Sequence, residues 1–339
     1  MKRVIIIAEA GVNHNGDMEL AKELIDAAAQ AGADYVKFQT FITELNISQT
    51  AAKAEYQINN TGSDESQYQM VKKLELSFAD FTELARYANQ KGIRFLSTAF
   101  DQPSLEFLSE LDIDYYKIPS GEITNLPFLR NIGRLQRKVI LSTGMCVLSE
   151  IVDAVKVLTD EGTKPDDIIV LHCTTDYPTA MADVHLDAML TIRKELGLEI
   201  GYSDHTLGIE VPIAAVALGA RVIEKHFTLN RSLPGPDHAA SLEPTELEAM
   251  VRAIRNIELA ITEDGVKQPT TAEQKNILIA RKSVHLAYAL NAGHVFTPED
   301  FIMMRPGDGI SPMKYEQLIG QTTKSSLPKY HKLSWEDVR

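Results

Sequence analysis

Short apolar, β-branched segments alternate with amphipathic segments along most of the chain. Each apolar segment ends in Gly, Ser, Thr or a charged residue, as buried parallel strands do. This alternation predicts a (β/α)8 TIM barrel, with a doubly wound open sheet as the alternative, because alternation alone does not prove closure. The predicted strands are Val4–Ala10, Tyr35–Gln39, Phe95–Phe100, Tyr115–Pro119, Val139–Thr143, Ile168–Cys173, Ile200–Ser203 and Val222–His226.

Helix start and stop signals separate these strands. Asp17 is a cap for a helix that runs to Gly32, and Ser77 with Asp80 forms a capping box for a helix that ends at Gly92. Ser149 is a predicted cap for a helix at Glu150–Thr159. The remaining predicted helices are Val211–Gly219, a crossover between the last two strands, and Glu243–Ile261, the last barrel helix.

Two stretches break the alternation. Glu44–Glu75 is a long polar insertion with a predicted turn at Asn59–Gly62, and it is either a binding loop or a tolerated surface excursion. The polar stretch that begins at Asp264 is a predicted linker. We therefore divide the chain into a barrel at 1–263, a linker at 264–282 and a small C-terminal domain at 283–339, in which Thr297–Asp300 starts a helix.

Composition restricts the partners. The formal net charge is −13 over 339 residues, which argues against binding to nucleic acids or anionic membranes. The apolar run at the N-terminus is too short for a signal peptide and Glu9 interrupts it, and no segment is long enough to span a bilayer. Cys146 and Cys173 are the only cysteines, so we expect reduced thiols in a cytoplasmic protein.

Reactive side chains collect at the predicted strand ends. His205 and His226 end neighbouring strands, where they either share a metal ion or are structural histidines bonded to backbone. Lys37 and Lys117 lie inside apolar strands. Burying an unpaired charge is costly, so each must meet an anionic ligand or a protein carboxylate.

The strand ends also carry carboxylates and small polar turns. Glu9 ends the first strand, where it is suited to orienting a hydroxyl-rich ligand or moving protons. The turns at Ser120-Gly121-Glu122 and at Ser142 could hold phosphate oxygens through their N–H groups. Together with the lysines they predict a pocket for phosphate and carboxylate groups in an acidic protein.

Several motifs, in this order, resemble the bacterial N-acetylneuraminate (sialic acid) synthase family. They are Glu9-Ala-Gly-Val-Asn-His-Asn-Gly16, Lys37-Phe-Gln-Thr40, Lys117-Ile-Pro-Ser-Gly-Glu122, Leu141-Ser-Thr-Gly-Met145, Ser203-Asp-His205, Glu224-Lys-His-Phe-Thr228 and Pro234-Gly-Pro-Asp237. Arg305-Pro-Gly-Asp-Gly309 resembles part of that family's antifreeze-like (SAF) domain. The segment Ala52–Gln57 looks like the sialate type, and legionaminate and pseudaminate synthases are close relatives.

The resemblance implies that phosphoenolpyruvate condenses with N-acetylmannosamine and water to give N-acetylneuraminate and phosphate. A legionaminic acid synthase, which uses 2,4-diacetamido-2,4,6-trideoxymannose, is the alternative. It implies that His205 and His226 hold a divalent metal, with Mn²⁺ expected before Mg²⁺ or Co²⁺, and that the protein is a domain-swapped homodimer. The resemblance further implies that Glu9, or its rival Glu122, positions the attacking water. It also implies two sets of binding residues. Phosphoenolpyruvate would meet Lys37, Lys117, Ser120, Gly121, Ser142 and Ser203, and the sugar would meet Gln39, Glu122, Tyr177, Asp237 and Arg305.

Two other classes of function stay open at this point. A Schiff-base aldolase would use Lys37 or Lys117 as its nucleophile. A sugar-binding module without catalysis is the second, although titratable groups gathered at one rim argue against it.

Overall fold

The computed structural model describes residues 3–62, 64–262 and 265–339. It separates into two compact units, Met1–Glu263 and Asp264–Arg339. The boundary residues Glu263 and Asp264 themselves lie outside the described residues.

Eight parallel strands form a closed barrel in chain order, in which β1 pairs with both β2 and β8. The predicted closed barrel is therefore confirmed over the open sheet. Each predicted strand is present, with its bounds shifted by no more than one residue. The strands are β1 Ile5–Gly11, β2 Tyr35–Thr40, β3 Arg94–Ala99, β4 Tyr115–Ile118, β5 Lys138–Ser142, β6 Ile168–Cys173, β7 Glu199–Asp204 and β8 Val222–His226.

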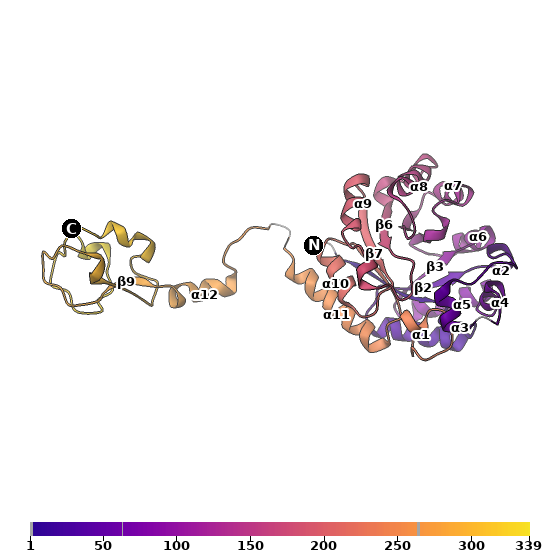
Figure 1. The fold of residues 1–339 in the computed structure, drawn as a ribbon, viewed down its shortest axis with the longest axis horizontal. Coiled ribbons are helices and arrows are strands. Elements are labelled where there is room, and N and C mark those ends of the chain that lie inside the picture. The colour runs from indigo at the N-terminus through magenta and orange to yellow at the C-terminus, as the bar shows by residue number, and fades with distance from the viewer. Residues whose placement is uncertain (1–2, 63, 263–264) are drawn as a thin grey trace. The chain divides into compact units, whose positions relative to one another are not determined.

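Helices surround these strands (Figure 1). Asp17 caps α1 through the N–H groups of Glu19 and Leu20, and the Ser77–Asp80 capping box opens α5, both as predicted. The predicted cap at Ser149 is wrong: α8 begins at Leu148, and the Glu150 carboxylate accepts a 2.9 Å hydrogen bond from the Val147 N–H. The surrounding helices are α1 Met18–Gln30, α5 Phe78–Gln90, α6 Gln102–Glu110, α7 Leu126–Arg134, α8 Leu148–Asp160, α9 Ala188–Leu196, α10 Glu210–Ala217 and α11 Pro244–Ala260.

The barrel interior is apolar toward the strand N-termini. Ile7, Leu96, Ile140, Leu171 and Val222 pack there as a cluster of their own, separate from the larger core between strands and helices. Gly201 of β7 is required at this level, because a Cβ would lie 2.4 Å from the Val222 carbonyl oxygen and 2.5 Å from Leu171. Since side chains alternate along a strand, the residues two positions further on point into the same interior.

The insertion after β2 folds into three short helices rather than an extended loop. They are α2 Thr43–Asn46, α3 Glu55–Thr61 and α4 Gln67–Lys72. The predicted turn at Asn59–Gly62 is wrong for its first three residues, which belong to α3, and Gly62 ends the helix with a φ of +76°. Val12, Phe41 and Leu74 form a small buried cluster that fastens the insertion to the ends of β1 and β2.

The C-terminal unit has its own core of Val284, Leu286, Phe296, Leu318 and Leu333. A two-stranded antiparallel sheet joins β9 Ser283–Leu286 to β10 Phe301–Met304, and the predicted helix start at Thr297–Asp300 is a single 3-10 turn. The range predicted as linker contains a helix, α12 Thr271–Ala280, which Thr270 caps. Its first half is polar and none of its residues is buried, which is why it resembles a linker.

Candidate active site at the C-terminal ends of the strands

A ring of polar side chains lies one step above the apolar layer of the barrel. Each of its residues follows an apolar interior residue by two positions on the same strand, so the strand alternation itself points these side chains inward. They enclose an inner cavity of about 100 Å³. The ring consists of Glu9, Lys37, Thr98, Lys117, Ser142, Cys173, Ser203 and Glu224.

Glu224 lies between the two lysines. One of its oxygens is 3.6 Å from Lys37 Nζ and the other is 3.6 Å from Lys117 Nζ. Lys37 also lies 2.9 Å from Glu9, and Lys117 donates a 2.7 Å hydrogen bond to Ser142. Protein carboxylates therefore meet both buried cations, and the same ammonium groups line the cavity.

The two glutamates bind protons with different affinity. Burial raises the pKa of Glu9 to about 7; Lys37 opposes this rise and the charge of Glu224 adds to it. Burial would also raise the pKa of Glu224, but Lys117 and Lys37 outweigh it and lower the value to about 2. Near neutral pH the site therefore holds one fixed carboxylate and one carboxyl group that can take up or release a proton.

The two lysines also differ. Burial lowers the pKa of Lys117, and the attraction of Glu224 only partly offsets this. Burial acts on Lys37 in the same sense, but Glu224 and Glu9 overcome it and raise its pKa. Lys37 is thus the more firmly charged of the two.

His205 directly follows β7 and His226 ends β8, and their ring centroids lie 5.5 Å apart. His205 Nδ1 bonds the Thr174 carbonyl oxygen at 2.5 Å, which leaves its Nε2 for a ligand, while Nδ1 of His226 is buried without a hydrogen-bond partner. Burial lowers the pKa of His205 to about 4 and that of His226 well below its usual value, so both imidazoles are neutral.

This arrangement fits a divalent metal. A neutral imidazole with one nitrogen fixed by a hydrogen bond and the other free is the usual state of a metal-binding histidine, and His205 has this state. His226 is neutral and its Nδ1 has no hydrogen-bond partner. Among the residues that the structure describes, no cluster of three or more His, Cys, Asp or Glu side chains could hold a metal ion. Two protein ligands would leave the other coordination positions to substrate or water.

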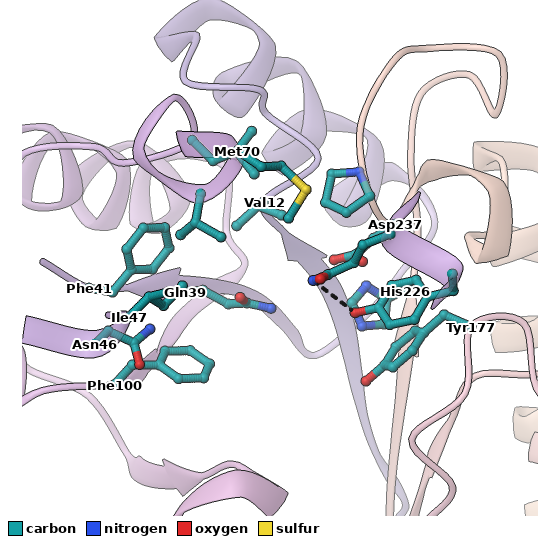
Figure 2. A pocket seen from close by; sticks show the side chains of 15 residues that line it. Val12, Gln39, Phe41, Asn46, Ile47, Met70, Phe100, Tyr177, His226 and Asp237 are labelled. Atoms are coloured by element: carbon teal, nitrogen blue, oxygen red, sulfur yellow. Dashed lines mark hydrogen bonds between the residues drawn. The ribbon is translucent and has the colours of Figure 1, made fainter. Parts of the chain in front are cut away.

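A second, outer cavity of about 210 Å³ adjoins the inner one. Gln39, Phe100, Tyr177 and His226 line both cavities. Figure 2 shows Phe41, Ile47 and Phe100 on one side of the outer cavity and Tyr177, His226 and Asp237 on the other.

The insertion forms part of the outer cavity's wall. Tyr56 of α3 lies with its ring centroid 5.0 Å from that of Tyr177, and Asn60 donates a 2.7 Å hydrogen bond to the Pro236 carbonyl oxygen. Met70 of α4 is buried against the cavity. Of the two interpretations of this insertion, the contacts favour a binding element over a surface excursion.

The structure brings most of the predicted site residues together, with three exceptions. Glu122 lies outside both cavities and accepts a hydrogen bond from Asn125, and its neighbour Gly121 is exposed. Arg305 belongs to the C-terminal unit, where it is exposed and its Nε donates to the Ala280 carbonyl oxygen. The predicted roles of these three residues stay predictions.

Sequence reasoning gave no role to Glu224, Thr98 or Cys173, although all three line the inner cavity. The signal that could have found them is the alternation of side chains along a strand, which places every second residue on the same face. Glu224 precedes His226 by two positions on β8, and Thr98 and Lys117 are register partners on β3 and β4. Ser120 lines the inner cavity, and its hydroxyl accepts a 2.8 Å hydrogen bond from the Gly144 N–H, which leaves its own O–H to donate.

Comparison with known proteins gives family matches over both units of the chain. The family model "NeuB family" matches residues 24–266, and the model "SAF domain" matches residues 281–339. The N,N'-diacetyllegionaminic acid synthase of Campylobacter jejuni is 51% identical, over 95% of this chain and 96% of that protein. The enzyme of the same name from Legionella pneumophila is 46% identical, over 98% of this chain and 94% of that protein.

A solved structure shares the fold. The crystal structure of the N-acetylneuraminic acid (sialic acid) synthetase from Leptospira borgpetersenii, in complex with citrate, aligns with a TM-score of 0.71 and 36% identity. The alignment covers 81% of this chain and 90% of the chain in that structure.

Proposed function

Because the chain belongs to the NeuB family and carries a SAF domain, we propose that it condenses phosphoenolpyruvate with an N-acetylated aldehyde sugar. The products are a nonulosonic acid and phosphate. The observation that carries the proposal is the pair of adjoining cavities, an inner one with two buried lysines and an outer one that meets it at His226 and Tyr177. A reaction between a strongly anionic substrate and an uncharged sugar needs one charged cavity and a second, adjoining cavity of different character.

The acceptor that we propose is 2,4-diacetamido-2,4,6-trideoxymannose, which makes the enzyme a legionaminic acid synthase. The sequence alone favoured N-acetylmannosamine, with this sugar as the alternative. The relatives at 51% and 46% identity are both named N,N'-diacetyllegionaminic acid synthase, whereas the sialic acid synthetase structure is 36% identical. These similarities support the alternative better than the first choice.

Phosphoenolpyruvate belongs in the inner cavity under this proposal. Lys37 and Lys117 supply charge-assisted hydrogen bonds to its carboxylate and phosphate, and Ser142 and Ser203 donate further ones. The fixed charge of Glu224 keeps the two buried lysines in place when the substrate is absent. Ser120 and Gly121 stay candidates for the phosphate end.

The reaction then proceeds in two bond-forming steps. The enol carbon of phosphoenolpyruvate attacks the sugar aldehyde carbon, a C–C bond forms, and the aldehyde oxygen takes up a proton. Water adds to the oxocarbenium-like carbon and loses a proton, and the C–O bond to phosphate breaks. Glu9, whose pKa is about 7, is suited to accept or supply one of these protons.

His205 and His226 would hold a divalent cation, for which Mn²⁺ is our first choice. Such an ion supplies Lewis-acid polarisation of the aldehyde carbonyl when it is bound. Gln39, Tyr177 and Asp237 line the outer cavity, where they are placed to bond the sugar's hydroxyl and amide groups. We propose that the protein works as a domain-swapped homodimer in which Arg305 meets the N-acetyl end of the acceptor.

The test measures phosphate release from phosphoenolpyruvate with each sugar, and identifies the product by mass spectrometry. We expect turnover with 2,4-diacetamido-2,4,6-trideoxymannose, loss of turnover with a chelator, and recovery with Mn²⁺. The His205→Ala and His226→Ala variants should be inactive. Absence of phosphate release with every N-acetylated aldehyde sugar would contradict the proposal, and a borohydride-stable adduct with pyruvate would point instead to a Schiff-base aldolase.

A further inference from the structure

The two cavities differ in chemical character. The inner cavity is lined by four residues with ionisable carboxyl or ammonium groups, Glu9, Lys37, Lys117 and Glu224. The outer cavity has a single acidic residue, Asp237, and a large share of its lining is hydrocarbon. Its apolar lining includes Phe41, Ile47, Met70, Val71 and Phe100.

The position of the aldehyde fixes how an acceptor sugar lies. The aldehyde carbon must reach the nucleophile in the inner cavity, so it belongs at the border formed by His226 and Tyr177. In an open-chain sugar C6 is the carbon farthest from the aldehyde. The far end of the sugar must therefore extend into the outer cavity, toward the wall that the insertion supplies.

We infer that Ile47 and Val71, two of the apolar residues that the insertion places in this wall, select an acceptor that ends in a C6 methyl group. Val71 packs against the buried Val12–Phe41–Leu74 cluster, so its place in the wall is fixed by the barrel itself. Water or a hydroxyl group at this wall would lack hydrogen-bond partners among the apolar side chains. This inference rests on the proposed function, and it names the residues that separate a 6-deoxy sugar from its 6-hydroxy counterpart.

Two polar residues of the insertion do not fill this role. Gln57 is buried and already engaged, since its Oε1 accepts hydrogen bonds from the Ala54 N–H at 3.0 Å and from Gln67 at 3.3 Å. Asn60 is not part of the cavity lining, and its side chain donates a hydrogen bond to the Pro236 carbonyl oxygen. A C6 hydroxyl group held against Ile47 and Val71 would meet hydrocarbon there, whereas Asn46 and Tyr56 are further polar residues that the insertion contributes to the cavity lining.

The first experiment changes the substrate and leaves the protein intact. Initial rates of phosphate release by the full-length wild-type enzyme are compared for 2-acetamido-2,6-dideoxymannose and N-acetylmannosamine, which differ only in the C6 hydroxyl. We expect kcat/KM to be about 10- to 100-fold higher for the deoxy sugar, the range in which an apolar pocket rejects an added hydroxyl group. Equal values for the two sugars would overturn the inference.

The second experiment changes the wall. Ile47→Thr and Val71→Thr each place a hydroxyl group where hydrocarbon stood, and together they should lower the ratio of the two kcat/KM values at least about 5-fold. Ile58→Thr is the matched control, because Ile58 lies on α3 of the same insertion, is 41% exposed and lines neither cavity. Circular dichroism and thermal unfolding report whether each variant is folded.

The outcomes separate the inference from the proposed function. If the wild type prefers the deoxy sugars and the two wall variants keep the wild-type ratio as Ile58→Thr does, the wall is not the selector and only the inference fails. If the wild type prefers N-acetylmannosamine, both the proposed acceptor and the inference fail. If no N-acetylated sugar releases phosphate, the synthase function itself fails.

Discussion

Two glutamates share Lys37 at the centre of the site, and yet the pKa of Glu9 is raised whereas that of Glu224 is lowered. Glu224 is close to both lysines, whereas Glu9 has only Lys37 and feels the negative charge of Glu224. Pairs of carboxyl groups whose environments separate their pKa values commonly divide acid–base and electrostatic work. Glu9 is accordingly our candidate for moving protons, and Glu224 for fixing the cations.

The first prediction concerns the lysines. Lys37→Ala and Lys117→Ala should each raise the KM for phosphoenolpyruvate about 10- to 150-fold, because each removes a charge-assisted hydrogen bond worth about 1.5–3 kcal/mol. The KM for the sugar should change less. Steady-state kinetics with each substrate varied in turn measures this, and Lys156→Ala, which removes an exposed lysine, is the control.

The lysine variants need a stability measurement as well, since each leaves a buried carboxylate without one partner. The variant Lys37→Ala combined with Glu9→Gln removes both charges of the close pair and separates the two effects. Unchanged phosphoenolpyruvate affinity in both folded lysine variants would make the lysines structural and put the anion site elsewhere.

The second prediction concerns how His14 makes the stability of the protein depend on pH. Burial lowers the pKa of His14 to about 4, with Asp17 partly opposing the shift, and its Nδ1 accepts a 3.0 Å hydrogen bond from the Gly16 N–H. The unfolded chain, with an ordinary histidine pKa, binds a proton below about pH 6.5 while the folded state does not. The stability from this group is therefore complete above pH 6.5 and is lost as the pH falls toward 4, by about 2 kcal/mol at pH 5.

Urea unfolding at pH 7 and pH 5 tests this expectation. His14→Asn keeps an acceptor for the Gly16 N–H and removes the titrating group, so its free energy of unfolding should fall less between the two pH values than that of the wild type. His331→Asn, in the C-terminal unit and partly exposed, is the control. An identical pH dependence in wild type and His14→Asn would show that His14 does not cause the loss of stability at low pH.

At the scale of elements, β7 and β8 are joined by a buried ion pair on their outer faces. Lys225 and Asp204 are both fully buried and form a salt bridge, and Lys225 also donates to the Thr206 carbonyl oxygen. Asp204 accepts hydrogen bonds from the N–H and hydroxyl groups of Thr206. The pair therefore fastens the two strand ends that carry His205 and His226.

The third prediction is that Lys225→Met lowers the free energy of unfolding by about 3–5 kcal/mol, because Asp204 is left charged and buried. Lys225→Met combined with Asp204→Asn should cost less than Lys225→Met alone, since it leaves no unpaired charge. Urea unfolding of the wild type, Lys225→Met, Asp204→Asn and the double variant measures this. A double variant that is as unstable as the sum of its singles would show that the two side chains act independently.

The strands could be predicted from the sequence because short β-branched segments bounded by Gly, Ser and Thr rarely form anything other than buried strands. Lys37 and Lys117 stood out because charged residues are rare inside apolar strands. Glu224 was passed over because its role appears only when three strands meet at one level. The wall built by the insertion depends on packing between distant segments, which local patterns do not encode. Helix α12 does carry a local signal, the capping box of Thr270 and Glu273, which the prediction of a linker did not use.

At the scale of the whole molecule, the barrel and the C-terminal unit each have a hydrophobic core. α12 has no buried residue within the described chain, and its Leu278 and Ile279 are 58% and 67% exposed. Exposed apolar side chains on such a helix are typical of a surface that packs on another one, either the barrel of the same chain or a second chain. In the described residues, no helix is long and apolar enough to cross a membrane.

The last prediction is that each active site uses residues from two chains. His205→Ala chains and Arg305→Ala chains, each inactive alone, are unfolded together and refolded. If Arg305 acts in the partner's barrel, each mixed dimer holds one site with both groups intact. About half of the dimers are mixed, and half of their sites are whole, so the mixture should recover roughly a quarter of wild-type activity.

The alternatives give different results in the same experiment. If Arg305 acts on the barrel of its own chain, every site lacks one group and the mixture stays inactive. Wild-type protein taken through the same unfolding and refolding measures the yield, and light scattering measures the mass of the refolded species. A mixture that recovers activity only as dimers form, and in proportion to them, requires Arg305 to cross between chains, whereas a fully active Arg305→Ala enzyme would remove this residue from the site.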